Sequence, residues 1–123
     1  MKNCEMVKKY TLLYGVQAAN MEEVGKRVAR ILDLKVILRN GLYSGDHVSC
    51  EGPTVDFLSI TLRDKKHIAP LTKDPKKYQF VLYVQNSSGK NIDKETRHSH
   101  VKKALSKVIG LTLLKEEIEE TKY

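Results

Sequence analysis

The strongest constraint on the fold is the alternation of β-rich segments with two segments of helical periodicity. Residues 6–16, MVKKYTLLYGV, are rich in β-branched and aromatic residues and predict a long strand. Asn20 follows as a helix N-cap, with Glu23 placed to reach back to it as in a capping box. The apolar residues after this cap recur at helical spacing: Val24, Val28, Ile31 and Leu32. Gly25 is costly inside a helix, so it indicates close packing of this helix on a sheet.

Four further strands are predicted before the second helix. The first is LKVIL, residues 34–38, and Asn40-Gly41 after it predicts a tight hairpin turn into the next strand. Residues 53–64 and 78–84 carry the remaining two strand patterns. Between them, residues 63–77 contain two prolines and six basic residues, and we expect a loop there.

The second helix is predicted over residues 93–109, capped by Asp93 and ended by Gly110. Its apolar stripe is formed by Val101, Leu105, Val108 and Ile109. LTLL, residues 111–114, predicts a short closing strand. KEEIEETKY, residues 115–123, is expected to be a frayed polar tail that is helical at best.

These patterns predict the order β-α-β-β-β-β-α-β in a single α+β domain spanning residues 1–123. The mostly short connections between the middle strands favour antiparallel pairing. Two amphipathic helices can then cover one face of a mainly antiparallel sheet, and we expect a ferredoxin-like variant with an extra hairpin. Because this fold hosts many unrelated functions, it does not indicate an activity.

The chain is basic, with 22 Lys and Arg against 15 Asp and Glu and a formal net charge of +7. Its charge excess is spread along the sequence, which favours nucleic acid or an acidic protein as partner. No apolar run approaches the roughly 20 residues of a membrane helix, and the first residues do not resemble a secretory signal. We therefore expect no membrane association, a cytoplasmic location, and reduced thiols at Cys4 and Cys50.

Neither a metal, a cofactor nor a catalytic residue is expected. The cysteines and histidines show no CxxC or HxxxH spacing. His47 and Cys50 fall on opposite faces of a strand because their spacing is odd. No glycine-rich phosphate loop leads into a helix. An enzyme that uses Cys50 with a histidine such as His47 or His67 is the alternative to a buried, structural cysteine.

Basic residues gather in two groups whose simplest explanation is a solvated surface. The loop group is Arg63, Lys65, Lys66, Lys73, Lys76 and Lys77. The second-helix group is Arg97, Lys102, Lys103 and Lys107. A small nucleic-acid-binding protein would use the 63–77 loop and the 93–109 helix to track phosphates. The usual RNA-recognition order of basic and aromatic residues on strands is absent from the sequence.

Three pieces of the sequence carry a resemblance to a known family. They are YTLLYGV followed by NMEEVGKRVARIL, RNGLYSGDHV after LKVIL, and YQFVLYV followed by a helix and GLTLL. In this order of elements the chain resembles the small bacterial immunity proteins of polymorphic toxin systems, including those of contact-dependent growth inhibition. The resemblance implies a non-catalytic protein that binds a cognate toxin, such as a nuclease, and occludes its active site.

Immunity proteins that face nucleases are often acidic, whereas this chain is basic. The resemblance therefore implies a toxin domain with an acidic contact surface, and an association that slows as salt rises. The hairpin and the basic loop are the predicted contact regions, with tyrosine and arginine as anchors. The predicted partner-binding residues are Arg39, Tyr43, Ser44, Asp46, His47, Arg63, Lys65, Lys66 and His67.

Overall fold

The structure is a computed structural model that describes residues 6–41, 45–62 and 68–122. Its elements, in chain order, are β1 (Met6–Val16), α1 (Met21–Leu32), β2 (Lys35–Gly41), β3 (Gly45–Glu51), β4 (Phe57–Leu62), the 3-10 turns η1 (Ala69–Leu71) and η2 (Pro75–Lys77), β5 (Phe80–Asn86), α3 (Asn91–Leu105) and β6 (Leu111–Lys122). The strands and α-helices follow the order that the sequence predicts.

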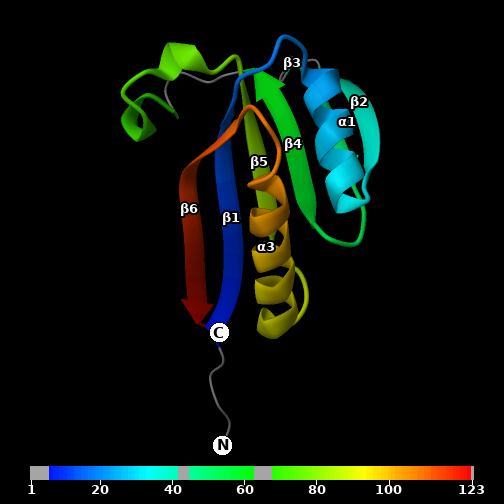
Figure 1. Ribbon diagram of the computed structural model, residues 1–123. Helices are drawn as coiled ribbons and strands as arrows, with labels where there is room; N and C mark the ends of the chain where they lie inside the picture. The colour runs from blue at the N-terminus through cyan, green and yellow to red at the C-terminus, as the bar shows by residue number, and fades with distance from the viewer. Residues whose placement is uncertain (1–5, 42–44, 63–67, 123) are drawn as a thin grey trace, which may run out of the picture.

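The six strands form one sheet in the order β2-β3-β4-β5-β1-β6, and each neighbouring pair is antiparallel (Figure 1). The helix α3 connects β5 to β6 on the far side of β1, which gives the split β-α-β arrangement of a ferredoxin-like fold. The strands β3 and β4 lie between β5 and β2. The predicted α+β class is therefore confirmed, and the additional strands are inserted within the sheet.

Both helices cover the same face of the sheet (Figure 1). The helix α1 contacts β2, β3 and β4, while α3 contacts β1 and β5. Between the helices and the sheet lies a core whose members include Leu12, Val16, Val28, Leu58, Ile60, Leu82, Val101 and Leu105. Each such side chain stabilises the fold by about 1.5–3 kcal/mol through removal of apolar surface from water.

The helix α1 begins where the sequence predicts it. The side chain of Asn20 accepts hydrogen bonds from the backbone N–H groups of Glu22 and Glu23, at 2.8 and 3.2 Å. The carboxylate of Glu23 pairs with Arg27 one turn later at 2.9 Å, so the contact that completes a capping box is replaced by an i, i+4 ion pair. Asp33 ends the helix in the left-handed conformation, with φ of 56°.

The predicted close packing at Gly25 is confirmed. A Cβ atom added there would lie 2.7 Å from Cγ1 of Val48 on β3. The carbonyl oxygen of Gly25 also lies 3.7 Å from the Sγ atom of Cys50, which can donate a weak hydrogen bond to it. The missing side chain therefore lets α1 rest directly on β3.

A smaller apolar contact lies on the opposite face of the sheet. The ring of Tyr78 packs over Gly15, where a Cβ atom would lie 2.6 Å from the ring. Tyr78 and Ile68 are both buried. The described part of the predicted 63–77 loop thus contains two 3-10 turns and a packed anchor rather than a solvated chain alone.

The second helix is shorter at its C-terminal end than the sequence predicts. It spans 91–105, so Lys90 and not the predicted Asp93 occupies its N-cap position, and Asp93 lies in its first turn. Val108 and Ile109 lie beyond its end, and Ile109 is 86% exposed. Tight turns follow the helix, in which Lys107 donates its N–H to the carbonyl of Ala104. Gly110, with φ of 94°, then redirects the chain into β6. The apolar pattern in the sequence thus continues to Ile109 although the helix ends at Leu105, because the chain reverses direction between the helix and β6.

The polar C-terminal segment is a strand, which corrects the prediction of a frayed tail over 115–123. The strand β6 runs to Lys122 and pairs with β1 along the whole of that strand. Its acidic side chains meet a basic neighbour, as in the pair of Lys8 and Glu120 at 3.8 Å. Because β1 supplies eleven residues of backbone partners, the segment pairs despite its poor strand propensity.

The hairpin is confirmed, but its predicted turn is displaced. Asn40 pairs with Asp46 and Gly41 pairs with Gly45, so Asn40-Gly41 belongs to β2. The connection is made by 42–44, which lie outside the described residues.

Candidate functional site, a basic groove between the helices

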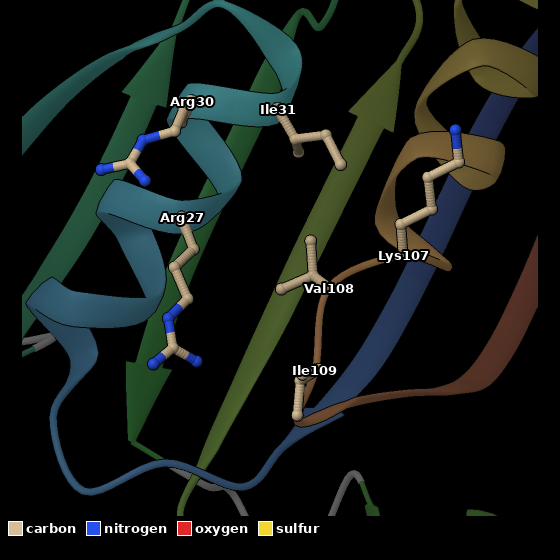
Figure 2. A pocket seen from close by; sticks show the side chains of 6 residues that line it. All are labelled: Arg27, Arg30, Ile31, Lys107, Val108 and Ile109. Carbon is tan, nitrogen blue, oxygen red and sulfur yellow. The ribbon is translucent and has the colours of Figure 1, made fainter.

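A groove of about 540 Å³ lies between α1 and the turns that follow α3. It is lined by Arg27, Arg30, Ile31, Lys107, Val108 and Ile109. Figure 2 shows Ile31 and Val108 extending from the two walls toward the space between them, with β5 passing behind. In this view Ile109 lies at the lower end, Arg27 and Arg30 extend outward from α1, and Lys107 lies on the opposite wall. We call this set of six residues the basic groove.

The first wall follows from helical periodicity. Positions 27, 30 and 31 are three and four residues apart, so they share one face of α1. Val28 and Leu32 point into the core from the adjacent face and are buried. Ile31 stands at the border of this apolar stripe and remains 36% exposed. The stripe predicted from the sequence is therefore wider than the surface that α1 buries.

The second wall follows from the way the chain leaves α3. Val108 donates its N–H to the carbonyl of Leu105 at 3.1 Å, which keeps the chain close to the helix end. Val108 packs partly against the core, whereas the next residue, Ile109, projects into solvent. The carbonyl of Gly110 accepts the N–H of Gln17 at 2.8 Å, which ties this wall to the chain that leaves β1.

Two of the three cations in the groove have no anionic partner among the described residues. Arg27 is bound by Glu23 at 2.9 Å. Arg30 and Lys107, in contrast, form no ion pair with any of the residues the structure describes. They come from opposite walls, so an incoming anion could meet a free positive charge on either side of the apolar middle.

A second group of ionisable side chains joins α3 to β6. The Nε2 atom of His98 lies 2.6 Å from one carboxylate oxygen of Glu116, and Lys102 donates to the other oxygen at 2.7 Å. These hydrogen bonds, with that of Lys102 first, hold the pKa of Glu116 below its ordinary value of 4.5. The His98 ring is buried and packs against the ring of Tyr10, with the centroids 4.9 Å apart.

This cluster was missed by the sequence reasoning, although a signal for it exists. His98 lies three residues before Val101 and seven before Leu105, on the same buried stripe of α3. Lys94 continues that stripe, is 1% exposed, and donates its Nζ hydrogen to the carbonyl of Lys8. The polar cluster therefore ties the helix to the edge of the sheet rather than presenting a set of exposed groups.

A third polar contact fixes the loop between β5 and α3. The carboxylate of Asp56 accepts the backbone N–H groups of Ser87 and Ser88, each at 2.6 Å. Arg97 pairs with the same carboxylate at 3.3 Å and donates to the carbonyl of Ser88 at 2.7 Å. Asp56 is an exposed residue, although these contacts leave only a quarter of its side-chain surface accessible.

The buried cysteine is confirmed. Cys50 is 2% exposed, and its thiol has a pKa raised to about 11 by burial away from water. Its neighbour in the strand on the same side is Val48, whereas His47 alternates to the other face. The thiol is therefore protonated at neutral pH and separated from His47.

Tyr43, Ser44, Arg63, Lys65, Lys66 and His67 lie outside the described residues. The backbone of Arg39 pairs with that of His47, and Asp46 lies on β3 opposite Asn40. These partner-binding residues therefore remain predictions. The basic groove was not predicted, because it joins an exposed isoleucine of α1 to residues assigned to the last turn of the second helix.

Within the described ranges, neither a metal-binding cluster nor a helix that could span a membrane is present. No three of their His, Cys, Asp and Glu side chains approach closely enough to hold a metal ion. Neither α1, with 12 residues, nor α3, with 15, has the length and apolar content that a membrane crossing requires.

The sequence matches no protein-family model and has no significant match among curated proteins.

Proposed function

We propose that this chain is a non-catalytic binding protein that neutralises a cognate toxin by binding it and occluding its active site. The toxin, such as a nuclease, would present an acidic contact surface, and both proteins would meet in the cytoplasm. The proposal rests on the resemblance to immunity proteins, on the net charge of +7 and on the basic groove.

One observation carries most of the proposal. Within the described residues, Arg30 and Lys107 stand without ion-pair partners on either side of the exposed apolar surface of Ile31 and Ile109. An exposed apolar surface bordered by cations is typical of a protein-binding surface, because burial supplies affinity and charge supplies orientation. The other ionisable clusters, around Glu116 and Asp56, are already engaged within the chain.

The alternative is a nucleic-acid-binding protein that uses the 63–77 loop and the 93–109 helix. Two of the four cations expected on that helix have intramolecular partners, since Arg97 pairs with Asp56 and Lys102 with Glu116. Ion-paired cations release fewer counterions from a nucleic acid. The helix therefore offers fewer unpaired cations to a nucleic acid, which favours the protein partner.

The proposal is tested by expressing this chain together with a toxin encoded beside its gene. We expect growth to be restored in cells that express both proteins, and the purified pair to form a stable complex. Filter binding to mixed RNA and DNA at low and high salt is measured in parallel. Absence of protection, or submicromolar binding to nucleic acid that weakens steeply with salt, would overturn the proposal.

A further inference from the structure

We propose that the basic groove binds an acidic segment of the partner, with an apolar side chain of that segment seated on Ile31, Val108 and Ile109. Carboxylates on both sides of this apolar anchor would pair with Arg30 and Lys107. The inference rests on the proposed function, because it names the chemistry of the partner at one particular surface.

The spacing of groups within the groove determines what fits it. Ile31 and Val108 extend from opposite walls, so they form one apolar surface at the middle of the groove (Figure 2). Arg30 belongs to the α1 wall and Lys107 to the wall that follows α3. A ligand that touches both cations must therefore span the apolar surface. A segment with an apolar residue flanked by acids has this pattern.

The charge of the groove selects an acidic occupant. Its lining contains three basic residues and no acidic residue. Among these three, and within the part of the chain that the structure describes, only Arg27 forms an ion pair, with Glu23. A basic or neutral segment would leave Arg30 and Lys107 without an anionic partner, whereas carboxylates would pair with both.

The openness of the groove favours a protein segment over a small ligand. A small-molecule site usually buries most of its ligand within an enclosed cavity. Here Ile109 is 86% exposed, and Arg30 and Lys107 are also exposed. Such a border cannot surround a small molecule, but a folded partner can cover the same surface and exclude water from it.

The experiment uses the full chain with labelled isoleucine and valine methyl groups, observed by NMR. The probe is a short synthetic peptide of glutamate with leucine at regular intervals. Two control peptides replace either the glutamates by lysine or the leucines by glycine. We expect shifts at the methyl groups of Ile31, Val108 and Ile109 with the first peptide, and much weaker or no shifts with the controls.

Matched variants separate the groove from overall charge. In the Arg30→Glu/Lys107→Glu variant we expect the peptide to bind at least about fivefold more weakly. Two exposed ion pairs with the peptide carboxylates are lost, and the reversed charges repel those carboxylates. Lys35→Glu/Lys90→Glu changes the net charge equally at exposed positions that neither line the groove nor belong to the basic loop. We expect this control to bind within about twofold of the wild type after screening by salt.

The apolar anchor has its own matched pair. Ile109→Ser removes an exposed side chain of the groove, and Ile92→Ser removes one that is 65% exposed at the other end of α3. We expect only Ile109→Ser to weaken binding of the glutamate–leucine peptide. Shifts confined to other methyl groups, or equal weakening by both charge variants, would overturn the inference.

Failure of the inference can be distinguished from failure of the proposed function. If the chain protects cells from the toxin while the groove variants protect equally well, the inference about the groove is wrong and the function stands. If the glutamate–leucine peptide binds in the groove but no toxin is neutralised, the groove chemistry stands and the proposed function is wrong.

Discussion

Gly25 of α1 lies so close to Val48 of β3 that an added Cβ atom would be 2.7 Å from the valine Cγ1. This contact brings the helix against the sheet and positions the carbonyl of Gly25 near the thiol of Cys50. It also places the outer face of α1, with Arg30 and Ile31, opposite the turns that follow α3. The groove therefore depends on a glycine that does not line it.

Substitution Gly25→Ala is expected to destabilise the protein. Alanine favours a helix over glycine by about 1 kcal/mol, but overpacking against Val48 costs about 1–3 kcal/mol. We expect a net loss of about 1 kcal/mol, measured by urea denaturation. In a Val48→Ala background the same substitution should be neutral or stabilising, because the clash is removed. Stabilisation by Gly25→Ala in the wild-type background would contradict the packing described.

The helix α1 illustrates what local sequence predicts well. Its N-cap at Asn20, its buried residues Val24 and Val28 and its close-packed Gly25 each follow from spacing that depends only on helical geometry. The strands that pair by short connections were found for the same reason, since their patterns are local and their neighbours are close in sequence.

The Cys50 thiol is expected to react slowly in the folded protein. Burial raises its pKa to about 11, so little thiolate is present at neutral pH. A thiol reagent should label it only after unfolding. The measurement uses a Cys4→Ser background, in which one thiol remains to be counted. Rapid labelling under native conditions at neutral pH would contradict the buried position and would favour the alternative of a reactive cysteine.

Acid is expected to weaken the contact between α3 and β6. The pKa of Glu116 is lowered by its hydrogen bonds with Lys102 and His98, so the folded state favours the charged carboxylate. Its contribution to stability is therefore complete above 4.5, the ordinary pKa, and is lost as pH falls through the lowered value.

Glu116→Gln isolates this effect. Glutamine does not titrate, so the decrease in Tm between neutral pH and about pH 3 should be smaller in the variant. At neutral pH the variant should melt below the wild type because the pair with Lys102 is lost. The matched control is Glu119→Gln on the same strand, which is exposed and forms no ion pair with any described residue. Equal acid sensitivity in all three proteins would contradict the role assigned to Glu116.

Features that depend on distant partners were not predictable in the same way. The β6 strand is polar and resembles a tail until β1 is known to lie beside it along its full length. The position of His98 on the apolar stripe of α3 is a local signal, but its partner Glu116 is brought to it from 18 positions away. Both outcomes are decided by tertiary contacts, which override local propensity.

The sequence predicted the charge of the partner but not the location of the candidate site. The basic excess and the need for an anionic partner follow from composition. The place where free cations meet exposed apolar surface does not, because it requires the end of α3 at Leu105 and the outward turn of Ile109. If the helix continued through Ile109, as the sequence predicts, the groove would lack the wall that the turns after α3 form.

The central claim is that this chain binds an acidic protein partner through the basic groove. The most direct test is the dissociation constant between the chain and the toxin against which it protects, measured at low and high salt. The account predicts binding that weakens with salt, at least about tenfold weaker binding for Arg30→Glu/Lys107→Glu, and little change for Lys35→Glu/Lys90→Glu. Equal affinity for the wild type and both variants would contradict it.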